Sequence, residues 1–198
     1  GHETTSSVMC FCLYELANNP KVLSKLQSEV DTFFNDLTTQ GEFPSYPKLK
    51  KLAYLQSVVK EALRMYPVAP VARVTTADVE LKGMNPNKSY VVPKGTEMYL
   101  HPYVACRFYW EDGDVFRPER WDDRTTNNSH VEKFFAFSLG ARNCVGRDFA
   151  VAELLITVAY LAHKFDVQLP SSDYNLKTAL RLTLTPVDCE LLFKTRIK

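Results

Sequence analysis

The stretch that decides the fold is Phe-Ser-Leu-Gly-Ala-Arg-Asn-Cys-Val-Gly, residues 137–146, which presents a cysteine directly before a long apolar segment. The thiolate form of this cysteine, Cys144, is expected to be favoured by the positive end of the helix predicted to follow it and by the guanidinium of Arg142. A thiolate binds metals and attacks electrophiles. Gly140 and Gly146 carry no Cβ atom, so they permit tight turns and let a flat ligand approach the backbone. The loop is therefore suited to hold a group against the sulfur.

The residues alone leave three interpretations of Cys144 open: a buried structural cysteine, a nucleophile or a metal ligand. A nucleophile needs a histidine base, but His101, His130 and His163 stand in no pattern typical of a triad. A zinc site needs partner ligands at short spacing, and no second Cys or His lies within ten residues of Cys144. A haem iron bound through a thiolate needs only one cysteine.

The pattern Phe-x-x-Gly-x-Arg-x-Cys-x-Gly resembles the haem-binding signature of the cytochrome P-450 family, the haem-thiolate monooxygenases, at all five diagnostic positions. The resemblance implies haem b, iron protoporphyrin IX, as the cofactor. It makes Cys144 the proximal thiolate ligand and Arg142 the partner of a haem propionate. It assigns Phe137 to shielding of the sulfur, and Gly140 and Gly146 to the turns.

The first five residues, Gly-His-Glu-Thr-Thr, precede a segment at 8–17 that is apolar on nearly all sides and is expected to form a buried helix. From the residues alone, Thr4 or Ser6 could be the helix cap. The five residues also resemble the end of the family's oxygen-activation motif, in which an acid and an alcohol face the distal side of the haem. That resemblance makes Glu3 and Thr4 the catalytic pair that relays protons to dioxygen.

Residues 52–66 predict a helix that ends before a proline, with Glu61 and Arg64 at i, i+3 on its polar face. By periodicity this is a surface ion pair of small energetic effect. The family's Glu-x-x-Arg helix suggests another role, because the segment Phe-Arg-Pro-Glu-Arg-Trp at 116–121 resembles the family's downstream segment. The resemblance implies a structural clamp in which Arg120 is the third member.

The rest of the chain predicts further helices and short strands. Asn19 and Pro20 are expected to begin a helix with one apolar stripe. Residues 147–164 are apolar almost all round and predict a long buried helix, which the resemblance places beneath the haem. Strands are expected at 68–74, 79–82, 90–92 and 97–100. The resemblance places a second propionate-binding arginine at Arg73. It gives six candidate substrate contacts: Val68, Ala69, Val71, Ala72, Leu182 and Thr183.

At the C-terminus, Leu180, Leu182 and Leu184 alternate on one strand face, and residues 186–188 form a turn. Residues 190–194 are then expected to return as the second strand of a hairpin. The predicted fold class is mainly α with small β-sheets (α+β). By resemblance, residues 1–198 are the C-terminal portion of a single cytochrome P-450 domain, a fragment that starts within the oxygen-activation motif.

Composition and charge exclude several classes of protein. The chain has 24 basic and 23 acidic residues among 198, so no charged field indicates a nucleic-acid partner. Five scattered cysteines form no disulfide framework and favour a reducing compartment. No apolar run is long enough to span a bilayer.

The function expected for the parent protein is monooxygenation of an apolar small molecule of fatty-acid, sterol or xenobiotic type. The resemblance implies dioxygen, an NADPH-dependent reductase or other electron donor, a monomeric state, and the cytosolic face of the endoplasmic reticulum membrane. Two alternatives remain: a haem-thiolate peroxide isomerase or dehydratase, and a truncated product that binds no haem. The chain by itself is expected to be poorly soluble and to bind haem weakly, because most of the distal wall is missing.

Overall fold

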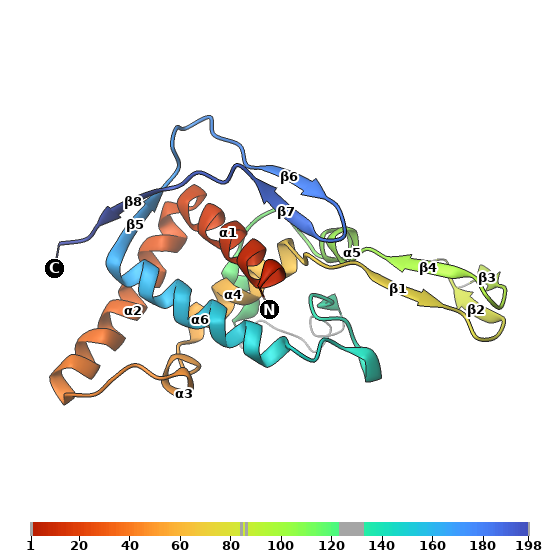
Figure 1. The fold of residues 1–198 in the computed structure, drawn as a ribbon, viewed down its shortest axis with the longest axis horizontal. Coiled ribbons are helices and arrows are strands. Elements are labelled where there is room, and N and C mark those ends of the chain that lie inside the picture. Colours follow the sequence, from red (N-terminus) through yellow and green to blue (C-terminus); the bar gives the residue numbers. More distant parts are fainter. Residues whose placement is uncertain (1, 84, 86, 123–132, 198) are drawn as a thin grey trace.

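The computed structural model describes residues 2–83, 85, 87–122 and 133–197. It confirms the predicted class, since the fold is mainly helical with small antiparallel sheets (Figure 1). The helices are α1 (Glu3–Asn18), α2 (Pro20–Gln40), α3 (Tyr46–Leu49), α4 (Ala53–Met65), α5 (Pro102–Phe108) and α6 (Arg147–Lys164), with short 3-10 turns at Pro118–Trp121 and Gly140–Arg142.

The core lies where α1, α2, α4 and α6 pack together. The segment of α1 predicted to be buried is indeed enclosed, and the ring of its Phe11 stacks on Tyr66 at 4.2 Å between centroids. The apolar stripe of α2 faces the same core through Leu26 and Val30, both fully buried. These helices form a rigid frame, and the loop before α6 emerges at one end of it (Figure 1).

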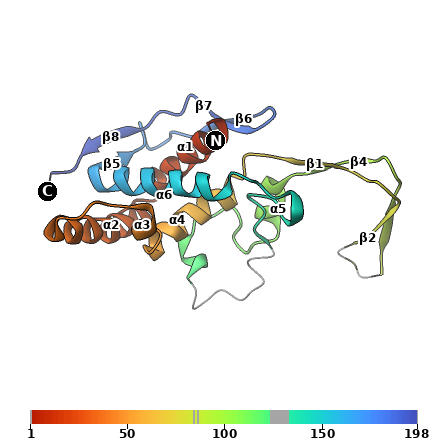
Figure 2. The same cartoon turned by 60° about the horizontal axis from the view of Figure 1, so that its bottom comes forward.

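Among the described residues, four two-stranded antiparallel sheets complete the fold. The β1 strand (Val71–Val74) pairs with β4 (Glu97–Leu100), and β2 (Val79–Lys82) pairs with β3 (Ser89–Val92). These four strands project from the helical body as an arm (Figures 1 and 2). Farther along the chain, β5 (Phe165–Gln168) pairs with β8 (Leu192–Thr195), and β6 (Lys177–Leu180) pairs with β7 (Leu184–Val187).

The predicted C-terminal hairpin is wrong in its register. The chain turns at residues 181–183, so Leu180 and Leu184 face each other across the ladder instead of sharing one continuous strand. The segment expected to return beside them, β8, pairs instead with β5, which directly follows α6. Period-2 alternation shows that a strand is present but not which distant strand it joins.

The helix caps also differ from the prediction. Neither Thr4 nor Ser6 caps α1, because the helix begins at Glu3 after His2 and has no side-chain cap hydrogen bond. Pro20 occupies the first turn of α2 as predicted, but the side-chain amide of Asn19 turns back and donates to the Glu15 carbonyl at 2.8 Å. Thr4 is thus left available for a role in the cavity described below.

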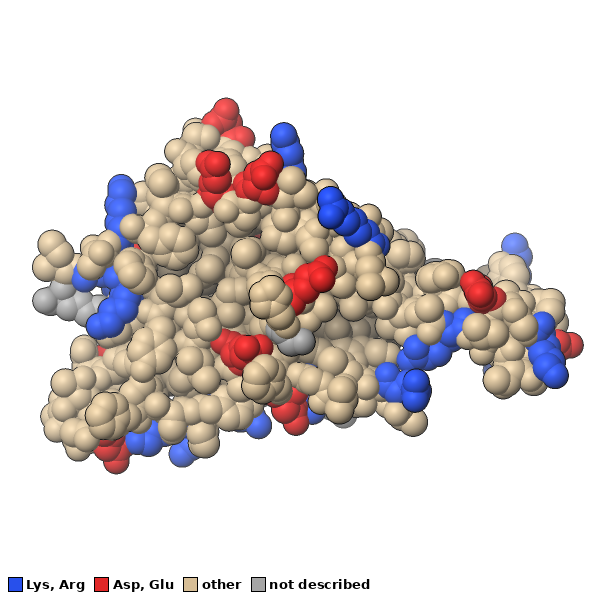
Figure 3. Space-filling model, in the orientation of Figure 1, with Lys and Arg blue, Asp and Glu red and all other residues tan. Residues whose placement is uncertain are grey.

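Acidic and basic side chains are interspersed on the face shown in Figure 3, and much of that face is uncharged. Two large apolar side chains at the start of α6, Val145 and Phe149, are exposed to 104% and 64%. No helix among the described residues is long and apolar enough to cross a bilayer.

Candidate active site

The loop that carries Cys144 is held by its own backbone. The Cys144 amide donates to the Phe137 carbonyl at 2.9 Å, which closes the loop just before α6 begins at Arg147. Inside it, the Asn143 amide donates to the Gly140 carbonyl at 3.1 Å and completes a 3-10 turn. The sulfur is therefore presented from a closed turn and remains exposed.

The two glycines of the loop act differently. Gly140 has a φ of +78°, a left-handed conformation that glycine adopts without strain. Gly146 has no such constraint, but a Cβ atom added there would lie 3.9 Å from the Cys144 sulfur. That distance is an ordinary van der Waals contact, so position 146 lies beside the sulfur but does not itself require glycine. Only Gly140 is required by the backbone conformation of the loop.

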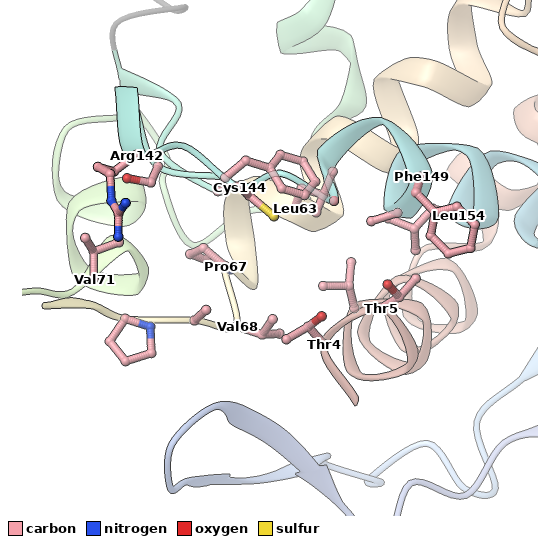
Figure 4. A pocket seen from close by; sticks show the side chains of 18 of the residues that line it. Thr4, Thr5, Leu63, Pro67, Val68, Val71, Arg142, Cys144, Phe149 and Leu154 are labelled. Carbon is pink, nitrogen blue, oxygen red and sulfur yellow. The ribbon is translucent and has the colours of Figure 1, made fainter. Parts of the chain in front are cut away.

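Cys144 borders a cavity of about 420 Å³ between the loop, the start of α1 and the segment that leads into β1. Figure 4 shows the sulfur pointing into this space, with Thr4 and Val68 across from it. The lining is mostly apolar and comprises Thr4, Thr5, Val8, Leu63, Pro67, Val68, Ala69, Pro70, Val71, Ala72, Arg73, Ala136, Phe137, Ser138, Arg142, Cys144, Gly146, Phe149, Ala150 and Leu154.

The cavity brings together most of the residues singled out from the sequence, although they lie on three separate segments. Those that line it are Thr4, Val68, Ala69, Val71, Ala72, Arg73, Phe137, Arg142, Cys144 and Gly146. Glu3, Gly140, Leu182 and Thr183 do not line it. Glu3 turns away and accepts a hydrogen bond from the Thr183 hydroxyl at 2.6 Å.

Two exposed guanidinium groups stand at the arm side of the cavity. Arg73 on β1 and Arg142 in the cysteine loop both line a second, adjoining pocket of about 340 Å³. Arg73 donates to the Ala72 carbonyl at 2.8 Å, and neither arginine forms an ion pair with another residue of the described part of the chain. Paired, uncompensated guanidinium groups are suited to bind carboxylates such as those of a porphyrin.

A buried hydroxyl also lacks a partner here. The Thr5 Oγ1 atom is shielded from solvent, lines the cavity and forms no hydrogen bond within the described residues. Buried polar groups normally have partners, so an orphan beside a cavity is consistent with a bound group or water. With one thiol, two arginines and an apolar lining, the donor set fits an iron porphyrin bound through Cys144.

Comparison with known proteins shows the family of the chain. The family described as Cytochrome P450 matches residues 1–193, nearly the whole chain. The chain belongs to the cytochrome P450 family. It is 36% identical to Cytochrome P450 3A17 of Cavia porcellus over 83% of this chain and 31% of that protein. It is 37% identical to Cytochrome P450 52A3-A of Candida maltosa over 93% of this chain and 37% of that protein.

A solved P450 structure shares the fold. The crystal structure of the cytochrome P450DA heme domain matches with a TM-score of 0.84 and 29% identity, over 100% of this chain and 42% of that chain. The chain thus spans about a third of the length of the curated P450 relatives it matches. The P450 family implies a haem-thiolate cofactor.

The helical-wheel interpretation of Glu61 and Arg64 as a surface pair is wrong, because both side chains are fully buried. The Arg64 guanidinium donates to both Glu61 carboxylate oxygens at 2.9 Å. Arg120 donates to Glu61 Oε1 at 2.8 Å, and the Trp121 indole to Oε2 at 2.9 Å. The three charged residues that the family resemblance connects are therefore in direct contact.

Backbone carbonyls satisfy the remaining donors of this cluster. Arg64 Nη1 donates to the carbonyls of Cys106 and Gly113, each at 2.7 Å. A Cβ atom at Gly113 would collide with the Arg107 backbone, so only glycine lets these segments approach so closely. Burial lowers the pKa of the Arg120 guanidinium, which Glu61 opposes by favouring its charged form. Sequence reasoning missed the roles of Gly113 and Trp121, although Trp121 ends the quoted downstream segment.

A second buried carboxylate lies near the C-terminal end of α1. The Tyr66 hydroxyl donates to Glu15 Oε1 at 2.5 Å, and the Asn19 amide donates to Oε2 at 3.2 Å. Burial raises the pKa of Glu15, and the Tyr66 hydrogen bond opposes this shift. No pattern in the sequence connects these residues, since Glu15 and Tyr66 are brought together only when α1 packs on α4.

Proposed function

We propose that residues 1–198 form the C-terminal part of a single P450 domain whose complete protein is a haem-thiolate monooxygenase acting on an apolar small molecule. One observation carries the proposal: the Cys144 sulfur and the Thr4 side chain border the same largely apolar cavity from opposite sides. A thiolate-bound haem supplies dioxygen activation, and the cavity supplies a proton-bearing hydroxyl on the facing wall.

The chain's own residues have separate tasks in this proposal. Arg73 and Arg142 hold the propionates, and the loop closed by the Phe137 carbonyl fixes the sulfur. With haem bound, the Phe137 ring, which lines the cavity, would shield the sulfur from water. The apolar wall formed by Val68, Ala69, Val71 and Ala72 favours a substrate with little charge.

In this proposal, Thr4 relays protons into the cavity. It lies at the first turn of α1, where its side chain can reach the cavity, and Glu3 precedes it beside solvent. Thr4→Ala in the full-length protein should divert electrons from product to hydrogen peroxide. Ser6→Ala is the matched control, because Ser6 is on the same helix, is exposed and does not line the cavity. Equal coupling in both variants would remove Thr4 from the proposal.

The proposed reaction requires an electron donor and dioxygen. From the likeness to animal and yeast relatives, the complete protein is proposed to lie at the cytosolic face of the endoplasmic reticulum membrane. The reaction class is tested with the haem-loaded full-length protein, NADPH, a reductase and isotopically labelled dioxygen. A monooxygenase places one labelled atom in an apolar substrate. Turnover of a lipid peroxide without reductase or dioxygen would identify a peroxide isomerase or dehydratase instead.

A further inference from the structure

The acid of the Glu3–Thr4 pair is bound by the opposite end of the chain. The Thr183 hydroxyl donates to Glu3 Oε1 at 2.6 Å, and Thr183 itself is only 9% exposed. Glu3 does not line the cavity, whereas the next residue, Thr4, does. The carboxylate is therefore turned toward the strand pair β6–β7 and away from the space that Cys144 faces.

Residues 181–183, here called the hairpin turn, join β6 to β7 beside the start of α1 (Figure 1). The amide of Leu184 donates to the carbonyl of Val68 at 2.7 Å, and Val68 lines the cavity. Leu182, at the middle of the turn, is 84% exposed. One short turn thus connects the Glu3 carboxylate, a wall of the cavity and an exposed apolar side chain.

We propose that Thr183 is a positioning residue: its hydroxyl holds the Glu3 carboxylate against the hairpin turn until an apolar substrate that contacts Leu182 displaces the turn. The released carboxylate takes up a proton from solvent and passes it to the Thr4 hydroxyl oxygen as Thr4 donates its own proton into the cavity. Glu3 is exposed, so solvent returns the proton that it loses. This inference rests on the proposed function, since the relay has a task only where dioxygen is reduced.

The strength of the contact makes such control feasible. A short hydroxyl–carboxylate hydrogen bond is charge-assisted and stronger than one between neutral groups. Its loss should change the ratio of the two carboxylate orientations by about tenfold. Without substrate no product can form, so protons delivered to reduced dioxygen release it as hydrogen peroxide. Thr183 is thereby expected to suppress this loss of electrons until substrate binds.

The test uses the haem-loaded full-length protein with Thr183→Val, which removes the donor, and Thr183→Ser, which keeps it. Thr185→Val is the matched control, because Thr185 lies on the same strand pair and donates only to the Ala179 carbonyl at 3.3 Å. The first readout is the infrared stretch of carbon monoxide bound to the reduced protein, which reports polar groups that enter the cavity. Thr183→Val should raise the population of a shifted band by about tenfold, and Thr183→Ser and Thr185→Val should match the wild type.

The second readout is hydrogen peroxide formed from NADPH and dioxygen without substrate. Thr183→Val should raise it severalfold over the wild type. In a Glu3→Gln background, the same substitution should change nothing further, because the group that Thr183 positions is then unable to donate the carboxyl proton. Thr183→Ala also removes the donor and has a smaller side chain. It must show the same increase in hydrogen peroxide, and it replaces Thr183→Val if Thr183→Val folds poorly.

The outcomes distinguish a failure of the proposed function from a failure of the role of Thr183. A wild-type protein without the thiolate-type carbon monoxide spectrum would overturn the proposed function and this inference with it. A normal spectrum together with an unshifted infrared band in both donor-free variants would overturn the role of Thr183 alone. An effect of equal size in Thr185→Val would also overturn it, because it would mean that hairpin stability and not the Glu3 contact is responsible.

Discussion

Two polar regions of this chain are built in opposite ways: the cluster around Glu61, and the wall of the cavity beside Cys144. In the first, every charged side chain is buried, and the carboxylate accepts bonds from Arg64, Arg120 and Trp121. In the second, the Cys144 sulfur and the guanidinium groups of the loop and β1 are exposed. The Thr5 hydroxyl there is buried without a partner among the described residues.

The two regions differ in whether their polar groups find partners within the protein. Groups with partners stabilise the fold, and groups without them are suited to bind a ligand. A buried polar cluster is tolerated when each member is satisfied within the protein. A buried hydroxyl without a partner is unfavourable unless something binds there, and exposed guanidinium groups without an ion-pair partner are free to bind an anion. The contrast predicts that substitutions in the first region change stability, whereas substitutions in the second change binding.

The largest effect on stability is expected from Glu61→Gln. The substitution leaves two guanidinium groups buried without a counter-charge, which should lower the free energy of unfolding of the full-length protein by about 3–5 kcal/mol. Glu80→Gln, at an exposed position of β2, is the control and should change it by less than about 0.5 kcal/mol. Denaturant unfolding measures both. Similar small losses in the two variants would mean that the cluster contributes little to stability.

An intermediate effect is expected at Glu15 and depends on pH. Burial raises the pKa of this carboxyl, so above about pH 4.3, the ordinary value, the folded protein holds the proton more tightly than the unfolded chain. Wild-type stability relative to Glu15→Gln should therefore fall as pH rises toward the raised pKa, by up to about 1.4 kcal/mol per pH unit. Above the raised pKa, the stability of the wild type relative to Glu15→Gln should be constant.

Urea unfolding of both proteins across this pH range measures the difference. Glu80→Gln again serves as the control, because an exposed glutamate should leave the pH dependence of wild-type stability unchanged. A relative stability that rose with pH would contradict the assignment, since that behaviour belongs to a carboxyl whose pKa is lowered by folding.

The smallest effect is expected from Thr5→Val in the haem-free protein. The lost hydroxyl has no partner, so the free energy of unfolding should stay within about 0.5 kcal/mol or increase. Ser7→Ala on the same helix is the comparison, because the buried Ser7 hydroxyl donates to the Glu3 carbonyl at 2.9 Å and its loss should cost about 1 kcal/mol. A larger loss at Thr5 than at Ser7 would place Thr5 among the satisfied groups.

Local features of the fold were predictable because their signals are local. Apolar periodicity and prolines marked α2, α4 and α6, and alternation with turn residues marked β1 to β4. The pairing of β5 with β8 was not predictable, since it joins segments separated by the β6–β7 hairpin. Alternation at Leu180, Leu182 and Leu184 suggested one strand where the chain turns back on itself.

In the candidate site too, contiguous motifs were predictable and contacts between distant segments were not. The cysteine loop is a contiguous motif, so its glycines, arginine and cysteine could be named from the sequence. The burial of Glu61 and Arg64 contradicts the helical wheel, because a wheel assigns polar residues to the surface and cannot include the segments around Cys106 and Gly113 that cover them. The contact between Glu3 and Thr183 joins residues at opposite ends of the chain, which no local pattern can indicate.

The central claim is that the exposed Cys144 is the ligand of a haem iron. It is tested most directly by the reduced, carbon monoxide difference spectrum of the haem-reconstituted full-length protein, compared with Cys144→Ser and with Cys189→Ser as the matched control away from the cavity. The account predicts a thiolate-type red-shifted Soret band in the wild type and in Cys189→Ser, and its loss in Cys144→Ser. The same thiolate-type band in Cys144→Ser, or a histidine-type band in the wild type, would contradict it.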